Sequence, residues 1–117
     1  SHSEAIAELR KAVDLSEGDR YAVASLGYGY AAAGRRAEAL AILKELEVKY
    51  ERHQALGQDL AAVYAGLGDK GQAFAWLEKD FQARSGQLSR TRWQLPFESL
   101  WSDQRFADLL RRMGLKP

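Results

Sequence analysis

Cysteine is absent from the 117-residue chain, which excludes a disulfide framework, a thiolate zinc site, an iron–sulfur cluster and a cysteine nucleophile. Histidine is nearly absent as well: His2 stands at the start of the chain, and His53 has no partner ligand at a spacing that suits zinc. No glycine-rich phosphate loop follows a predicted strand. We therefore expect no cofactor, no metal and no enzymatic activity.

A net charge of one sign is also lacking, since 17 basic residues stand against 16 acidic ones. The resulting charge of +1 gives no overall field that would attract nucleic acid or an anionic membrane. The hydrophobic content of 46% is enough for one folded domain. No apolar run approaches the roughly 18 residues of a membrane span, so we expect a cytoplasmic protein without membrane contact.

The clearest pattern that is present is a repeat with a period of 34 residues, which is typical of stacked repeats. It predicts two units, residues 20–53 and 54–87. The same offset places residues 4–19 as the second helix of an upstream repeat, and residues 1–3 are interpreted as a cloning remnant. The recurring residues are Leu26, Tyr30, Gly34, Ala39 and Leu43, which return as Leu60, Tyr64, Gly68, Ala73 and Leu77.

Within each unit the apolar residues follow the helical period, so each unit is predicted to be a pair of helices. Gly34 and Gly68 are expected to end the first helix of each pair, and Asp19 and Asp69 to cap the helices that come directly after them. The only two prolines lie at residue 96 and beyond, so they interrupt none of these helices.

Small residues are expected where the paired helices cross, with Gly27 facing Ala39. A second glycine, Gly29, has no explanation in the sequence beyond tight packing. In the leading half-repeat, Ile6 and Leu9 lack the helix that would cover them, which predicts that residues 4–16 either form a homodimer through this surface or stay partly mobile.

This arrangement resembles the tetratricopeptide repeat (TPR), a 34-residue helix–turn–helix, over residues 4–87. The resemblance implies an all-α, right-handed superhelix with a C-terminal helical cap, and a module that binds proteins or peptides. Asp80 departs from the family pattern because it replaces a small residue, and we expect it to weaken the contact with the next segment of the chain. The matching positions are Leu26, Gly27, Tyr30, Gly34, Ala39, Leu43 and Leu46, then Leu60, Ala61, Tyr64, Gly68, Ala73 and Leu77.

A narrower likeness involves residues 68–79, 84–86 and 103–115, which resemble C-terminal repeat segments of bacterial multidomain signalling proteins. This resemblance implies an alternative function, in which the segment regulates an upstream DNA-binding, kinase or cyclase domain by packing against it.

In the tail, residues 88–117, the repeat spacing fails but helical periodicity returns. Pro96 suits the first turn of a helix, Ser102 is expected to cap the next one, and Gly114 to end it. The apolar stripe of Phe106, Leu109, Leu110 and Met113 predicts a cap over the last repeat. The alternative is a tail that occupies the binding groove and inhibits it.

The first helix of each pair is expected to line a concave groove, with Tyr21 and Tyr28 as anchors because tyrosine combines large area with a hydroxyl. Packing against a neighbouring helix is the alternative role for both. TPR proteins that clamp a C-terminal carboxylate carry Lys, Arg and Asn in the groove, and the matching places here hold none of these. We therefore predict a protein or peptide ligand such as an amphipathic helix, without a carboxylate clamp. The ten predicted groove residues are Tyr21, Ala24, Ser25, Tyr28, Ala31, Ala55, Gln58, Asp59, Ala62 and Ala65.

Residues 83–117 hold seven basic and three acidic residues, a local charge of +4, together with Trp93 and Trp101. These features suit contact with nucleic acid. Solvated arginines beside an apolar cap explain the same counts, and we expect no nucleic-acid partner.

Overall fold

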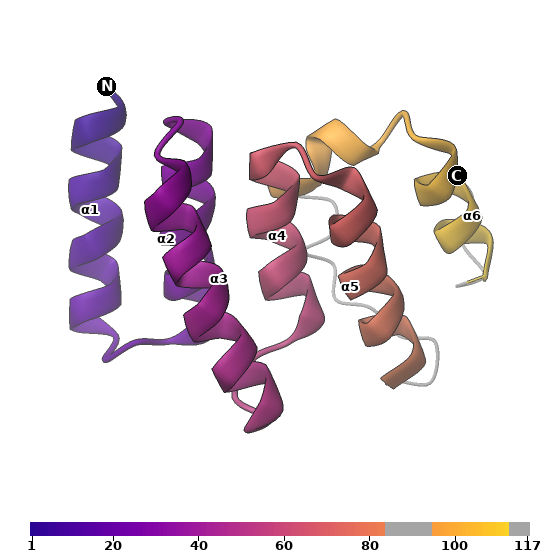
Figure 1. The fold of residues 1–117 in the computed structure, drawn as a ribbon, viewed down its shortest axis with the longest axis horizontal. Helices are drawn as coiled ribbons and strands as arrows, with labels where there is room; N and C mark the ends of the chain where they lie inside the picture. The colour runs from indigo at the N-terminus through magenta and orange to yellow at the C-terminus, as the bar shows by residue number, and fades with distance from the viewer. Residues whose placement is uncertain (84–94, 113–117) are drawn as a thin grey trace.

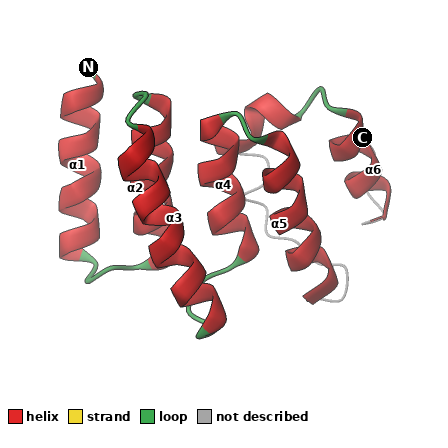
Figure 2. Cartoon of the chain, in the orientation of Figure 1, coloured by secondary structure: helices red, strands yellow, loops and turns green. Residues whose placement is uncertain are grey.

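The computed structural model describes residues 1–83 and 95–112, and every regular element in those two ranges is helical (Figures 1 and 2). Consecutive helices run antiparallel and lie in a row, so the predicted all-α solenoid of helix pairs is confirmed. The elements are α1 (His2–Leu15), α2 (Arg20–Ala32), α3 (Arg36–Glu51), α4 (Gly57–Leu67), α5 (Lys70–Ala83), the 3-10 helix η2 (Leu95–Leu100) and α6 (Gln104–Arg112).

The helix ends follow the capping chemistry that the sequence predicts. The Asp19 carboxylate accepts a hydrogen bond from the Tyr21 N–H at 3.0 Å, and Asp69 caps α5 in the same way. Gly34 and Gly68 have φ values of 77° and 81°, a left-handed conformation that glycine adopts without a Cβ clash. These four local predictions are confirmed.

The core forms two clusters that meet at α4. One cluster joins α1, α2, α3 and one side of α4, where Leu60 and Val63 are buried. The other joins Ala61 of α4 to α5, η2 and α6, with Leu77 and Leu100 at its centre. Because α4 belongs to both clusters, it couples the two halves of the molecule.

Two glycines of α2 allow neighbouring helices to approach closely. A Cβ on Gly27 would lie 2.6 Å from Ile42 Cγ2 and 2.7 Å from Val63 Cγ2, so α2, α3 and α4 meet at this residue. The sequence predicted Ala39 as its neighbour, and the atoms that lie closest instead belong to Ile42 and Val63. A Cβ on Gly29 would lie 2.6 Å from Leu9 Cδ1, so contact with α1 accounts for this glycine.

The expectation of an uncovered leading helix is wrong. Ile6 is only 4% exposed, and Leu9 packs against the same cluster, because α1 turns both side chains toward α2. Ile6 and Leu9 therefore do not form the exposed apolar pair that the predicted homodimer requires. Ser1 also accepts a hydrogen bond from the Glu4 N–H at 3.3 Å, so residues 1–3 belong to the first turn of α1 and its cap.

The helix α6 in the tail begins in the 34-residue register of the repeats, although the side-chain pattern of the repeats is not recognisable there. Helices α3, α5 and α6 begin at residues 36, 70 and 104, so their first residues are 34 positions apart. The residue that caps α6 is Asp103, which accepts a hydrogen bond from the Arg105 N–H at 2.9 Å. The prediction that Ser102 is the cap is wrong, because Asp103 directly precedes the helix.

We call η2 and α6 the third unit. The predicted roles of Met113 and Gly114 lie outside the described residues.

The third unit covers the second repeat, as the predicted cap should. Phe97 and Leu100 of η2 are buried against α4, while Phe106 and Leu109 of α6 are buried in the cluster that contains Phe74 of α5. Figure 1 shows η2 behind α4 and α5, and α6 beside α5.

Candidate peptide-binding face

The structure brings the ten predicted groove residues to α2, α4 and the turn before α4, but it exposes them unequally. Tyr21 is 54% exposed. Ser25, Tyr28 and Ala31, also on α2, are half-buried. The remaining six are buried: Ala24, Ala55, Gln58, Asp59, Ala62 and Ala65. The accessible part of the predicted groove is therefore confined to α2.

Contacts between successive units explain part of this burial. A Cβ on Gly66 of α4 would lie 2.9 Å from the Tyr28 ring and 3.0 Å from the Ala31 Cβ, so these two α2 residues pack on α4. One unit later, Ala62 and Ala65 lie in the cluster that contains η2. The packing role that the sequence left open for Tyr28 is therefore real, and it accompanies partial exposure.

Asp59 of α4 connects this helix to α2, because it accepts a hydrogen bond from Arg20. Its side chain is 3% exposed, and one oxygen lies 3.0 Å from Arg20 Nη1 in an ion pair. Its other oxygen accepts from the Leu56 N–H at 2.8 Å at the start of α4. Burial raises the pKa of Asp59, and the Leu56 hydrogen bond and the Arg20 charge act in the opposite direction. In this conformation the Asp59 carboxylate is engaged by Arg20 and Leu56, and it is not accessible to a ligand.

The expected weak contact between Asp80 and the next segment stays a prediction, because residues 84–94 lie outside the described residues. The structure shows instead that Asp80 completes the start of α4. Its carboxylate is 3% exposed and accepts hydrogen bonds from the N–H groups of Gly57 and Gln58, both at 2.7 Å. Leu56, the residue at the cap position, has no side-chain acceptor, so an acid from α5 supplies it. Sequence analysis missed this role because the acceptor lies 23 positions after its donor.

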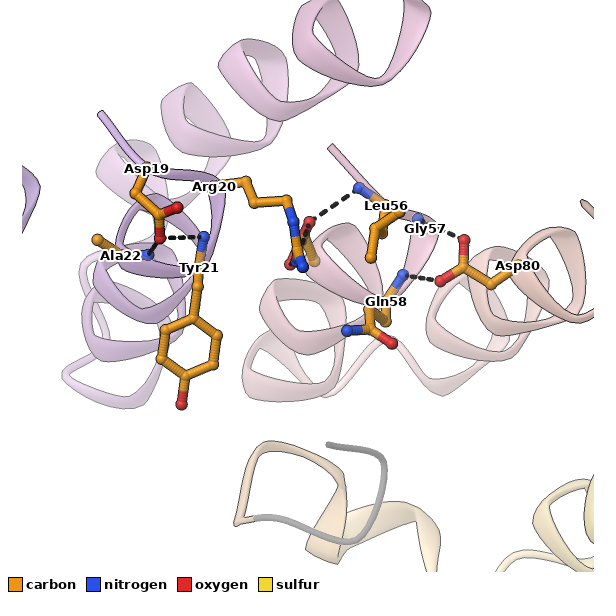
Figure 3. A network of polar contacts seen from close by, with 9 residues as sticks. Asp19, Arg20, Tyr21, Ala22, Leu56, Gly57, Gln58 and Asp80 are labelled. Carbon is orange, nitrogen blue, oxygen red and sulfur yellow. Dashed lines mark hydrogen bonds and ion pairs between the residues drawn. The ribbon is translucent and has the colours of Figure 1, made fainter. Parts of the chain in front are cut away.

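The exposed Tyr21 lies next to the Arg20–Asp59 ion pair, at the first turn of α2. Figure 3 shows the Tyr21 ring and the Gln58 side chain extending away from the ion pair on the same side of their helices. Gln58 is 7% exposed, and its side chain makes no hydrogen bond within residues 1–83 and 95–112. The Arg20–Asp59 ion pair holds the first turn of α2, which carries Tyr21, against α4.

The arginines of α6 are paired with acids of the chain. Arg105 lies 3.0 Å from Asp103, and Arg112 pairs with Glu78 of α5. These pairs compensate the positive charge that the tail shows in the described part. The basic residues Arg84, Arg90, Arg92 and Lys116 lie outside the described residues, as does Trp93.

In the described ranges, 1–83 and 95–112, no group of three or more acidic or histidine side chains could hold a metal ion. None of the helices described is long and apolar enough to cross a membrane.

Antiparallel helix pairs in a 34-residue register define a helical-repeat solenoid, a class of protein that presents a surface for partners. The chain belongs to the tetratricopeptide repeat family, whose model matches residues 1–97. The match ends inside η2, where the side-chain pattern fades although the helix register continues. Comparison with curated proteins gave no match, and neither did comparison with solved structures. Membership of this family supports a protein-interaction module.

Proposed function

We propose that this chain binds a protein partner through the α2 face, which we define as Tyr21, Ser25, Tyr28 and Ala31. The observation that carries the proposal is the exposure of Tyr21, 54%, on a helix whose first turn is capped and ion-paired. A large amphipathic ring on a rigid helix loses little conformational entropy on binding, and tyrosine is therefore a frequent anchor at interfaces.

The chemistry of the α2 face favours an amphipathic helix as the ligand. It offers two phenol rings, a serine hydroxyl and an alanine methyl group, and none of its four members carries a charge. Arg20, which directly precedes Tyr21 in the sequence, is paired with the buried Asp59 carboxylate. A segment that presents apolar side chains at helical spacing, with polar groups at its edge, suits this surface better than a terminal carboxylate.

The test uses a helical peptide selected from a displayed library against the whole chain, with its Kd measured by fluorescence anisotropy. Tyr21→Ala should weaken binding by about tenfold or more, as expected for an aromatic anchor. Val48→Ala is the matched control, because Val48 is 50% exposed but lies on α3. The proposal fails if Tyr21→Ala leaves the Kd unchanged, or if the Val48 variant loses affinity to the same extent.

A further inference from the structure

A groove with a volume of about 470 Å³ lies between α5 and α6, and we call it the α5–α6 groove. Its α5 wall consists of Gly71, Phe74, Ala75 and Glu78, which are spaced as one face of a helix. Gly71 and Ala75 are exposed, so this wall leaves room for an incoming side chain. The volume lies within the roughly 300–1,000 Å³ that is common for ligand pockets.

The opposite wall, on α6, consists of Arg105, Asp108, Leu109 and Arg112, each 34 positions after a residue of the α5 wall. The two walls are therefore the same face of successive helices in the repeat. At the positions of the two arginines, α5 has a glycine and a glutamate, and α3 has an alanine and a lysine. The repeat itself therefore does not require an arginine at either end of the groove.

Each of these arginines is held over an aromatic ring of α5. The guanidinium carbon of Arg105 lies 4.8 Å from the centre of the Phe74 ring. That of Arg112 lies 5.4 Å from the centre of the Phe81 ring. Such stacking orients a guanidinium while its N–H groups remain available for hydrogen bonds. The two arginines are seven residues apart on α6, which corresponds to a rise of about 10 Å.

Each arginine also keeps one N–H position that has no partner within residues 1–83 and 95–112. Asp103 accepts from Nε and Nη2 of Arg105, which leaves Nη1 open, and Nη1 lies 3.8 Å from the place that a Cβ on Gly71 would occupy. Glu78 accepts from both Nη atoms of Arg112, which leaves Nε open. Both ends of the groove therefore present a cationic hydrogen-bond donor.

From this arrangement we propose that the α5–α6 groove is a second binding site, and that its ligand is an acidic peptide segment. Two carboxylates of the segment, about 10 Å apart, accept hydrogen bonds from Arg105 and Arg112. A large apolar side chain between them packs on Phe74 and Ala75. The groove shares no residue with the α2 face, so this proposal does not rest on the proposed function.

A nucleic acid also offers anions, but the groove suits it less well. The lining between the two arginines includes the apolar residues Phe74, Ala75 and Leu109. Each wall also carries an acid, Glu78 on α5 and Asp108 on α6, and these acids would repel a row of phosphates. A peptide can place one carboxylate at each arginine and neutral side chains beside the acids.

The test uses amide NMR spectra of the whole chain, titrated with a synthetic helical peptide. The peptide carries two glutamates at the spacing of Arg105 and Arg112, with a leucine between them. The Gly71 and Ala75 signals should shift and saturate, and the double variant Arg105→Gln with Arg112→Gln should raise the Kd at least about tenfold. Arg111→Gln is the matched control, because Arg111 lies on the same helix and is 55% exposed but does not line the groove.

A second variant blocks the groove without a change of charge. Ala75→Phe places a ring at an exposed position of the α5 wall and should abolish these shifts, whereas Tyr21→Ala should leave them unchanged. Because Tyr21-dependent binding is measured with its own peptide, the failure of either proposal is distinguishable from the failure of the other.

The proposal is overturned if the peptide produces no saturable shift at Gly71 and Ala75, or if Arg111→Gln weakens binding as much as the double variant. Equal binding of a peptide with glutamine in place of both glutamates overturns it as well. So does a thymidine oligonucleotide that shifts the same signals and displaces the peptide, since that result would assign the groove to nucleic acid.

Discussion

At the scale of single residues, Asp80 completes a helix whose own first turn provides only part of the capping it needs. Four N–H groups at the start of any α-helix have no partner within it. Here Asp59 accepts from one neighbouring N–H, and Asp80 accepts from two more across the helix pair. Both carboxylates are buried, so their loss would leave donors without water to replace them.

Asp80→Ala should therefore lower the free energy of unfolding by about 2 kcal/mol or more. Asp80→Asn keeps one oxygen acceptor and should lose less. Urea unfolding followed by circular dichroism measures both variants. Glu45→Ala, which removes an exposed acid of α3, is the control and should stay within about 0.5 kcal/mol of the unchanged chain. Equal stability of the Asp80→Ala and Glu45→Ala variants would contradict the capping role.

The two glycines at 57 and 71 should respond to alanine in opposite directions. A Cβ on Gly57 would collide with the Trp76 carbonyl oxygen and lie 2.7 Å from Asp80 Oδ1, and the carbonyl cannot move without α5. Gly57→Ala should cost about 1–3 kcal/mol by overpacking. A Cβ on Gly71 meets nothing closer than 3.8 Å, so Gly71→Ala should stabilise helix α5 by up to about 1 kcal/mol. Thermal unfolding of the two variants gives the signs, and a stabilising Gly57→Ala would refute the close approach.

At the scale of elements, α6 depends on the charged state of its cap. The Arg105 side-chain hydrogen bond, followed by the Arg105 backbone N–H, lowers the pKa of Asp103 to about 2. Because this value lies below the ordinary 3.8, the capped form of α6 is favoured at pH values above 3.8, and that preference is lost as the pH falls toward 2. Burial acts in the opposite sense on Asp59: its pKa is raised, so protonation favours the folded state there.

A carboxyl-carbon NMR titration should therefore find that Asp59 protonates before Asp103 as the pH falls, with the pKa of Asp59 above the ordinary 3.8 and that of Asp103 near 2. The α6 amide signals should move with Asp103 and not with Asp59. The reverse order of midpoints would show that the Arg105 contacts do not hold the cap in solution.

The elements also show where sequence reasoning succeeds and where it stops. Asp19, Asp69 and Gly68 act on atoms within a few residues of themselves, so their chemistry is readable from local sequence. Contacts across helices are not local. Asp80 acts on Gly57, and the close approach at Gly29 depends on Leu9, whose position is known only once the helices are packed.

The same limit applies to the candidate site. The repeat register identified helices α2 and α4 as carriers of the groove, and the structure places all but one of the ten residues on them. It could not give exposure, because Ala62 is buried in a cluster that also contains residues of α5, η2 and α6. Likewise Asp59 is inaccessible because Arg20, 39 positions earlier, pairs with it. Position is set by the period, whereas accessibility is set by the part of each helix that the next unit covers.

At the scale of the whole molecule, α4 couples two clusters whose stability should not be equal. The first cluster is sealed by α1, α2 and α3, while the second depends on the third unit, whose η2 contact with α4 lacks polar bonds among the described residues. In a stacked array, stability is close to a sum of unit and neighbour contributions. A substitution in α4 should therefore destabilise the whole row, and one in the third unit only its own end.

Leu60→Ala and Leu100→Ala separate these two effects, because both side chains are leucines with 0% exposure. Leu60→Ala creates a cavity in the shared helix and should lower global stability by about 2–5 kcal/mol, with all helices losing hydrogen-exchange protection together. Leu100→Ala should increase hydrogen exchange in η2 and α6 while α2 and α3 stay protected. Leu40→Ala, at 39% exposure on α3, should change either pattern little. If Leu100→Ala instead lowers protection in α2 and α3 as much as in α6, the third unit is part of one indivisible fold and the solenoid does not open from that end.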